Sequence, residues 1–238
     1  MTEEIWFLKQ CDLFRRLTPE EIARLEPRCR TRRFKRGEPI YLPAESADAA
    51  LVLAEGRVKI GSVTEEGKQT ILALIEPGEL FGELSVLDDT PREEFAQAAE
   101  KSTVVLLPAD ALRALVEQNP SVALGVTKLI GLRRRRIERR LKSLMFRSNR
   151  QRLVSLLTDL AEQYGEPAES PRGAVRLRIK LSHQDLASII GSTRETVTVV
   201  LGELQQEGLV EVGRRRMVLL APARLAAAAN GPGLSQPS

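Results

Sequence analysis

The sequence predicts a mixed α+β protein with two folded domains joined by a long helix. Short β-rich runs separated by glycine fill residues 32–107, and a proline-free helical pattern follows Pro120. Two short helices around a glycine turn then lie between residues 181 and 208. With 238 residues, 42% of them hydrophobic, the chain is long enough to bury the cores of two modest domains.

The N-terminal domain is predicted from its turns and strands. Thr18-Pro19-Glu20-Glu21 is a helix start, with a hydroxyl N-cap, proline at the first position and acids in the first turn. The β-rich runs beyond it, such as residues 50–53, 58–60 and 70–75, alternate with regularly spaced glycines. Short strands with regular turn signals predict a sandwich or a jelly-roll-like barrel. A short helix is expected from about residue 108 to 117.

The segment from Asn119-Pro120 to about residue 145 predicts a helix roughly 40 Å long at ~1.5 Å per residue. Its apolar positions recur at three-, four- and seven-residue spacings. They are Val126, Ile130, Ile137, Leu141 and Leu144. A single apolar stripe on an otherwise basic helix needs a cover, and a second copy of the same helix is the expected one. The alternative is burial against the chain's own β-domain. The arginines of this helix are expected to form a solvated flank.

The C-terminal region predicts a helix-turn-helix. Ser182 caps a first helix with Asp185 three residues later, and Gly191 ends it. Thr193 caps a second helix that Gly208 closes. A helix at about residues 150–163 and a proline- and glycine-containing loop at 165–173 precede them. Residues 209–212 and 217–220 are expected to be strands around a small basic wing.

The second of these helices leaves polar residues at its N-terminal end, where a recognition helix meets base edges. Arginine can bind guanine and glutamate can accept from cytosine, whereas threonine hydroxyls and helix N-terminal amides suit phosphate. The predicted base contacts are Arg194, Glu195, Thr198 and Val199. The predicted phosphate contacts are Gln184, Thr193, Thr196, Arg214, Arg215 and Arg216. Periodicity alone also permits a helical bundle that does not bind DNA.

Composition argues against several other classes of protein. The net charge of +4 is a weak argument for a nucleic-acid partner, but the arginines are clustered at residues 133–136 and 214–216. The two cysteines, Cys11 and Cys29, are too few for an iron–sulfur cluster, and the single histidine, His183, disfavours zinc hydrolases and histidine-based triads. Neither a signal peptide nor a membrane span is expected, so a cytoplasmic protein is predicted. A jelly-roll enzyme with a regulatory tail is the remaining catalytic alternative, with Glu83 as its candidate carboxylate.

Five segments in order resemble the cyclic-AMP receptor protein/fumarate-nitrate regulator (CRP/FNR) superfamily of bacterial transcription regulators. They are residues 34–38 (FKRGE), 55–59 (EGRVK), 77–85 (PGELFGELS), 119–120 (NP) and 191–197 (GSTRETV). The last segment, with residues 181–184 before it, is particularly similar to the nitrogen-control branch. The resemblance implies a cyclic-nucleotide-binding-like β-roll at 1–118, a dimerisation helix at 119–146, a winged helix-turn-helix at 147–229 and a disordered tail at 230–238.

The resemblance also implies partners and roles. The expected partners are double-stranded DNA, a second copy of the chain and RNA polymerase. Arg194 and Glu195 would read bases, while Gln184, Thr193 and Thr196 would contact phosphate. Val199 stands where the family often has another arginine, which loses one guanine contact or exchanges it for contact with a thymine methyl group.

The effector pocket is where the sequence departs from the family. In cyclic-AMP binders, the segment matching Gly82-Glu83-Leu84 leads to an Arg-Ser pair that binds the cyclic phosphate. Counting forward reaches Glu93 and Glu94, whose carboxylates would repel a phosphate. A turn one residue shorter would instead put Arg92 at the phosphate position.

The purine-binding residues of the family align with Ile137 and Glu138, so the second half of the contact is also missing. Cyclic AMP is therefore not the expected effector. Haem sensing is disfavoured because no histidine precedes His183. The remaining possibilities are an unrecognised small ligand, another nucleotide held by Arg133 and its neighbours to residue 136, or no ligand. No cofactor or metal is expected.

Overall fold

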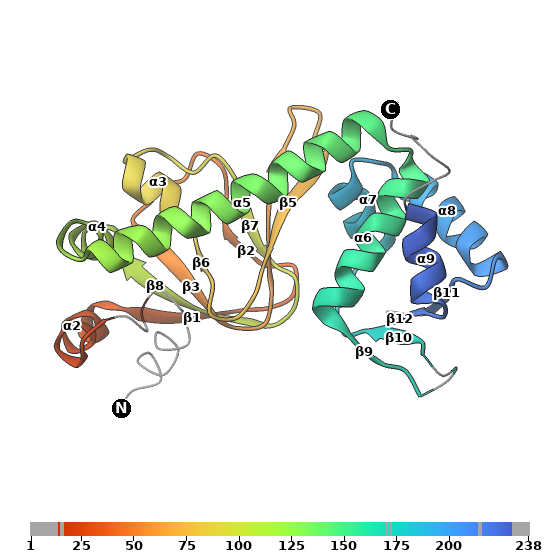
Figure 1. The fold of residues 1–238 in the computed structure, drawn as a ribbon. Helices are drawn as coiled ribbons and strands as arrows, with labels where there is room; N and C mark the ends of the chain where they lie inside the picture. Colours follow the sequence, from red (N-terminus) through yellow and green to blue (C-terminus); the bar gives the residue numbers. More distant parts are fainter. Residues whose placement is uncertain (1–13, 15–16, 170, 172, 214–215, 230–238) are drawn as a thin grey trace, which may run out of the picture. The chain divides into compact units, whose positions relative to one another are not determined.

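The computed structural model describes residues 14, 17–169, 171, 173–213 and 216–229 (Figure 1). The chain forms two compact units, residues 1–136 and 137–238, and each is described by itself. The predicted tail at 230–238 lies outside the described residues, as do Cys11, Arg214 and Arg215.

The described part of the first unit opens with a short helix at the predicted place. Helix α2 (Pro19–Leu25) begins with a capping box in which Thr18 and Glu21 bond each other's backbone N–H groups. A 3₁₀ turn, η2 (Glu26–Arg28), follows directly. Ile22 and Leu25 point into the core, which fixes the helix against the domain.

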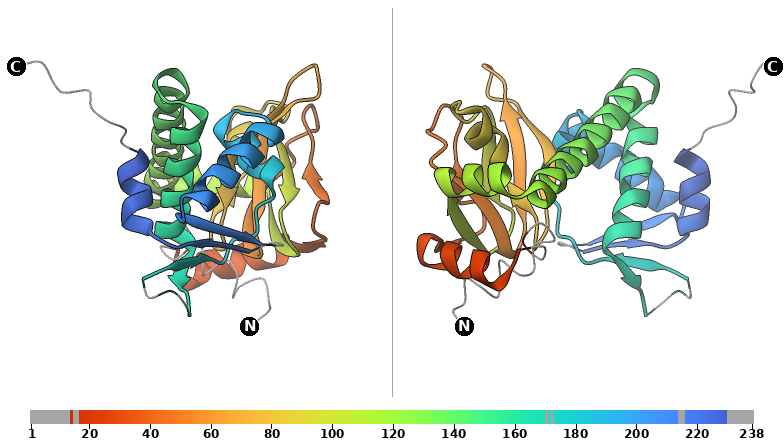
Figure 2. Two further views of the ribbon diagram at one scale, coloured as in Figure 1. Left: turned by 90° about the vertical axis from the view of Figure 1, so that its right-hand side faces the viewer. Right: turned by 60° about the vertical axis from the view of Figure 1, so that its left-hand side comes forward.

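Eight strands form two antiparallel sheets, as Figures 1 and 2 show. The first has the order β1-β8-β3-β6 and the second β2-β7-β4-β5. Their bounds are β1 (Arg30–Phe34), β2 (Pro39–Tyr41), β3 (Ala49–Glu55), β4 (Val58–Val63), β5 (Gln69–Ile75), β6 (Leu80–Phe81), β7 (Phe95–Ala98) and β8 (Ser102–Pro108). This arrangement confirms the predicted β-roll.

Strand β3 shows how the first unit divides its core. Successive side chains of a strand point to opposite faces. Leu51 and Leu53 pack between the two sheets, with Tyr41 and Phe81. Ala50, Val52 and Ala54 face the other side, where the helices of the unit lie. Because both faces are covered, β3 is an almost continuous apolar run rather than an alternating one.

Three further helices complete the first unit or extend from it. They are α3 (Glu83–Asp88), α4 (Ala109–Gln118) and α5 (Pro120–Phe146). Asn119 caps the start of α5, because its Oδ1 accepts from the backbone N–H groups of Ser121 at 3.1 Å and Val122 at 3.3 Å. The 27 residues of α5 form the predicted long helix, and the boundary between the two units falls within it.

In the second unit, helices pack against a small antiparallel sheet. Its sheet order is β11-β12-β10-β9. Its elements beyond α5 are α6 (Asn149–Tyr164), β9 (Gly165–Pro167), β10 (Val175–Leu177), α7 (His183–Ile190), α8 (Arg194–Gln206), β11 (Val210–Gly213), β12 (Arg216–Leu219) and α9 (Pro222–Ala229). The predicted loop at 165–173 begins instead as a strand, because the backbone of β9 pairs with β10. Helix α9 was not predicted.

Candidate nucleic-acid interface

The turn between α7 and α8 is built as the sequence predicts. Ser182 and Asp185 form a complete capping box at the start of α7. Gly191 ends the helix with a φ of +65°, in the left-handed region that favours glycine. Thr193 then caps α8, where its Oγ1 accepts from the backbone N–H of Thr196 at 3.2 Å. The two helices therefore have fixed starting points on either side of a short turn.

Helix α8 has one buried and one exposed face. Its buried residues are Val197, Val200, Leu201 and Leu204. The four predicted base contacts, Arg194, Glu195, Thr198 and Val199, are all exposed in its first two turns. Val199 is 61% exposed, so that its apolar side chain lies at the surface of the helix. The structure thus brings these four residues together on one accessible end of the helix.

The predicted phosphate contacts differ from one another in exposure, and two of them lie outside the described residues. Gln184 is exposed in the first turn of α7, and Arg216 is exposed at the start of β12. Thr193 is exposed and Thr196 is half-buried, and their hydroxyl oxygens lie 2.9 Å apart. The wing residues Arg214 and Arg215 lie outside the described residues. The hairpin of β11 and β12 that carries them is present in the predicted place.

Two arginines from neighbouring helices bind backbone carbonyl oxygens at the end of α7, just before the turn. Nη2 of Arg140, on α5, donates to the carbonyl oxygen of Ser188 at 2.8 Å. Nη1 of Arg152, on α6, donates to the carbonyl oxygen of Ile190 at 2.7 Å. Burial lowers the pKa of Arg140 to about 10. Arg140 was expected in a solvated flank, but its side chain satisfies a helix-end carbonyl instead.

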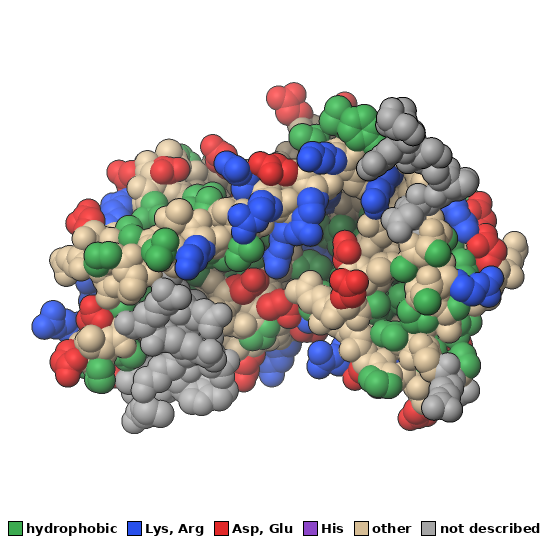
Figure 3. Space-filling view, viewed as in Figure 1, with side chains coloured by type: hydrophobic (Ala, Val, Ile, Leu, Met, Phe, Trp, Pro, Cys, Tyr) green, Lys and Arg blue, Asp and Glu red, His purple; other side chains and the backbone are tan. Residues whose placement is uncertain are grey.

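The other arginines of α5 give that helix a basic surface, which Figure 3 shows as a row of Lys and Arg side chains. Arg134, Arg135, Arg136 and Arg139 are exposed, as predicted for a solvated flank. Arg133 is different, because its Nη1 donates to Oε1 of Glu83 at 2.7 Å and its Nη2 donates to the carbonyl oxygen of Leu80. This arginine therefore joins α5 to the segment predicted to bind an effector.

Glu83 is the central acid of the β-roll interior. It begins α3 directly after Gly82, whose φ of +65° turns the chain from β6 into the helix. Its side chain is 1% exposed, and the Arg133 guanidinium supplies the opposite charge. The neighbouring Leu84 points outward and is exposed. A buried carboxylate needs such a partner, because an unpaired charge is costly in a protein interior.

Arg92, rather than Glu93, occupies the interior of the β-roll. It is 5% exposed, donates to the carbonyl oxygens of Gly82 and Ala49, and lies over the ring of Tyr41 at 4.5 Å from its centroid. Glu93 is exposed. Of the two turns considered, the shorter one, which puts Arg92 at the phosphate position, agrees with the burial of Arg92, while Glu94 is also half-buried.

The acidic and phenolic groups of this interior have shifted pKa values. Burial raises the pKa of Glu94, and the negative charge of Glu83 raises it further. Burial also raises the pKa of Tyr41, with a contribution from Glu94. Burial lowers the pKa of Arg92, against the attraction of Tyr41 and nearby acids. In this interior, the loss of solvation is the largest cause of each shift and disfavours the charged form of all three groups.

The predicted dimer stripe on α5 divides into two parts. Val126 is 4% exposed and belongs to the core of the β-roll, and Ile130 packs against the same core. Val126 is therefore covered by the chain's own domain, which corrects its place in the predicted dimer stripe, whereas Ile130 is only partly buried and its dimer contact stays a prediction. Ile137 and Leu141 are 48% and 57% exposed, and Leu144 is also exposed.

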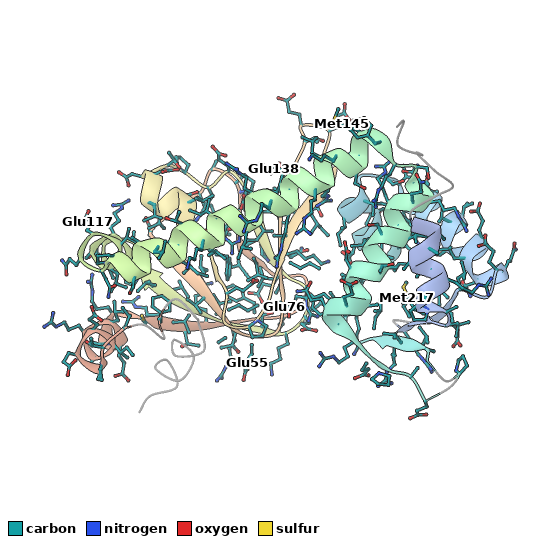
Figure 4. The ribbon with its side chains drawn as sticks, in the orientation of Figure 1. Glu55, Glu76, Glu117, Glu138, Met145 and Met217 are labelled. Carbon is teal, nitrogen blue, oxygen red and sulfur yellow. The ribbon has the colours of Figure 1, made fainter. Side chains whose placement is uncertain are left out.

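Ile137 and Glu138, which were predicted to line the effector pocket, belong to the second unit and are exposed on α5. Figure 4 shows Glu138 and Met145 on the C-terminal half of this helix. Among the described residues, His, Cys, Asp and Glu side chains form no group of three suited to a metal ion. Among the helices of the described residues, none is long and apolar enough to span a membrane.

Comparison with known proteins decides the family. Residues 31–119 match the family model described as cyclic nucleotide-binding domain, and residues 151–228 match the Crp-like helix-turn-helix domain. The global nitrogen regulator of Synechococcus elongatus is 32% identical over 194 residues, which cover 81% of this chain and 86% of that protein. The chain belongs to the CRP/FNR superfamily.

Other CRP/FNR proteins are similar over more of the chain. The CRP-like cAMP-activated global transcriptional regulator of Mycobacterium tuberculosis is 28% identical over 219 residues, or 92% of this chain and 96% of that protein. The crystal structure of a CRP/FNR-family transcriptional regulator from Thermus thermophilus is 31% identical with a TM-score of 0.68. The similarity covers 86% of this chain and 100% of the Thermus thermophilus chain.

The family predicted from the motifs is therefore confirmed, and so is the prediction that the chain is a DNA-binding transcription regulator rather than an enzyme. Sequence reasoning placed Arg133 in the effector pocket but did not predict its pairing with Glu83, and it missed the internal roles of Arg140 and Arg152, because arginines on a helix look alike in one sequence. It also missed that His183 contacts Thr198 across the helix-turn-helix. Their pairing has no sequence signal, since fifteen residues and a turn separate them.

Proposed function

We propose that this CRP/FNR regulator acts as a homodimer that binds a pseudo-palindromic operator through α8. The observation that carries the proposal is the exposure of Arg194, Glu195, Thr198 and Val199 at one end of a helix whose other face is buried. Arginine and glutamate recognise guanine and cytosine in the major groove, and a capped helix N-terminus favours nearby phosphate. The regulator would act in the cytoplasm and contact RNA polymerase there.

The exposed apolar residues of α5 support the homodimer. Ile137 and Leu141 are four residues apart, so they lie on one face of the helix. A second copy of α5 offers the same residues in return, as a two-fold interface requires. Two recognition helices related in this way would meet half-sites about one helical turn of DNA apart, roughly 34 Å.

The test is binding of the full-length protein to genomic fragments, followed by footprinting. A protected site with two-fold symmetry is expected. Arg194→Ala should lose sequence preference by about tenfold or more at the base pair it reads. Arg224→Ala, which removes an exposed arginine of α9 in the same unit, is the matched control and should keep it. Equal binding of wild type and Arg194→Ala to all duplexes would reject the proposal.

For regulation, we propose that DNA binding does not depend on cyclic AMP, so that the effector is an unrecognised one or is absent. The internal contacts of the β-roll support this. Glu83 already has a cationic partner in Arg133, and the two terminal nitrogens of Arg92 each donate to a backbone carbonyl oxygen. A ligand phosphate would have to compete with these contacts and with the half-buried Glu94.

The experiment measures the operator affinity of protein freed of small molecules under three conditions. They are the protein alone, the protein with cyclic AMP and the protein with cell extract. Equal affinity in all three supports a regulator without an effector, whereas rescue by extract alone supports an unrecognised ligand. A large gain of affinity from cyclic AMP alone would reject the proposal.

A regulator that responds to a cyclic nucleotide or cyclic dinucleotide is the second candidate. The observation in its favour is that Oε2 of Glu83 and Nε of Arg92 are buried without a hydrogen-bond partner among the described residues. An acceptor and a donor of this kind suit a ribose hydroxyl and a phosphate oxygen. Calorimetry with cyclic AMP and cyclic di-GMP tests it. Micromolar binding that Arg92→Gln abolishes would favour this candidate over the first.

A further inference from the structure

The side chain of His183 reaches from the first residue of α7 to the exposed face of α8. Its Nδ1 lies 2.9 Å from Oγ1 of Thr198. The same hydroxyl donates to the carbonyl oxygen of Arg194, one helical turn earlier, at 2.9 Å. His183 is half-buried, whereas Thr198 is exposed. This contact joins the first helix directly to a residue on the surface that we propose to read DNA.

The two contacts decide which part of Thr198 is left for a partner. A threonine hydroxyl has one hydrogen, and Thr198 donates it to Arg194. Nδ1 of His183 donates to the hydroxyl oxygen in the tautomer with its hydrogen on Nδ1, and in the other tautomer it accepts the hydroxyl hydrogen in place of the Arg194 carbonyl oxygen. The hydroxyl hydrogen of Thr198 is therefore used within the protein. Its methyl group makes neither of these bonds.

Val199 adds a second apolar group beside it. It follows Thr198 directly and is 61% exposed. Both residues belong to the second turn of α8, next to Arg194 and Glu195. Among the four DNA bases, thymine carries a methyl group in the major groove, and small apolar side chains recognise it by contact.

We propose that His183 is a positioning residue that holds the hydroxyl of Thr198 against the protein, so that α8 presents the methyl groups of Thr198 and Val199 to thymine. The proposal rests on the proposed function of α8 as the recognition helix. It assigns specificity for thymine to a residue of α7 that has no need to touch a base itself.

The experiment uses the full-length protein and the duplex that it selects from a randomised pool. Each thymine of one half-site is replaced in turn by deoxyuridine, which lacks only the methyl group. For the wild type we expect a loss of affinity of about fourfold at one or two positions, the effect of a methylene-sized apolar contact. Thr198→Ser, which keeps the hydroxyl and removes the methyl group, should lose the effect at one of them.

His183→Asn and His183→Gln are the decisive pair. The amide group of asparagine can occupy the place of Nδ1, since both are attached to Cγ, whereas the amide of glutamine lies one bond farther out. We therefore expect His183→Asn to keep the deoxyuridine effect at the Thr198 position and His183→Gln to reduce it to less than twofold. Circular dichroism checks that both variants are folded.

Each alternative result has a distinct meaning. If His183 contacts phosphate alone, both variants weaken all duplexes equally and leave the deoxyuridine effect unchanged, which overturns the proposal. If the wild type shows no deoxyuridine effect but Arg194→Ala still removes sequence preference, the thymine assignment is wrong while the recognition helix stands. If Arg194→Ala changes nothing, the proposed function itself fails.

Discussion

At the scale of the residue, Gly191 is a position where the backbone conformation favours glycine over any other amino acid. Its φ of +65° ends α7, and an added Cβ would lie 2.8 Å from the side chain of Leu144. The left-handed conformation costs a residue with a Cβ about 1–2 kcal/mol, while the Leu144 side chain can move. Gly191→Ala should therefore lower the free energy of unfolding of the second unit by about 1–2 kcal/mol, measured in urea.

Gly202→Ala is the matched control for this change. Gly202 lies within α8, and an added Cβ would meet no atom within 4 Å. Alanine in a helix interior is favoured over glycine by about 0.5–1 kcal/mol, so this variant should be more stable than the wild type. Equal effects of the two substitutions would mean that the turn at Gly191 tolerates another conformation.

Glu94 allows a prediction about pH. Its pKa is raised above the ordinary 4.5, first by burial and then by Glu83. A carboxyl group that holds its proton more tightly when folded stabilises the fold at low pH, and this contribution is lost as pH rises through the folded pKa. Glu94→Gln has no ionisable group at this position, so the variant does not lose this stability as the pH rises. The variant should therefore gain stability relative to the wild type between about pH 4, below the ordinary pKa, and about pH 8.

Urea unfolding at the two pH values measures the difference. Glu93→Gln provides the control, because Glu93 is an exposed neighbour with the same chemistry. It should change stability little at either pH. A difference between Glu94→Gln and wild type that stays constant with pH would contradict the raised pKa of Glu94.

At the scale of the element, the capping box of α7 determines where the helix-turn-helix begins. Ser182 accepts from the backbone N–H of Asp185, and Asp185 accepts from that of Ser182. Ser182→Ala should cost about 1 kcal/mol of unfolding free energy, because a helix-end N–H loses its partner. Thr158→Val is the control in the same unit. It removes a hydroxyl that donates to its own helix at Val154, so we expect a change below about 0.5 kcal/mol.

Elements with local signals were predictable from the sequence. Helices α2, α7 and α8 have capping residues at their starts, and the strands of the β-roll have glycine turns between them. Strand β9 was missed because Gly165 and Pro167 favour a loop, and only the pairing with β10 makes the segment a strand. The burial of Val126 was missed for a similar reason. An apolar stripe does not reveal whether its cover is another domain or another chain.

At the scale of the whole molecule, the exposed part of that stripe leads to a prediction about assembly. Leu141→Asp places a charge on the face we propose to meet a second α5. The variant should sediment as a monomer, and its operator affinity should fall by about a hundredfold or more, because the two half-sites are then bound independently. Leu132→Asp is the control. Leu132 is 50% exposed but lies nine residues earlier, on the opposite side of the helix.

Retention of the dimer in Leu141→Asp, or its loss in both variants, would place the interface elsewhere. The exposed face of α8 could be predicted because the spacing of a capped helix shows which positions point inward, and Arg194, Glu195, Thr198 and Val199 are exposed in its first two turns. The β-roll interior could not be predicted to the same degree. The choice between Arg92 and Glu93 depends on the length of one turn, and the pairing of Arg133 with Glu83 depends on how α5 packs on the β-roll.

His183 is the single histidine of the chain. Its ring protons therefore give the one set of imidazole signals in a nuclear magnetic resonance spectrum of the 26.4 kDa chain, without any need for site-specific labelling. Titration of the native protein with short duplexes can follow this probe directly. The regulator thus contains its own spectroscopic reporter, beside the surface that we propose to distinguish one DNA sequence from another.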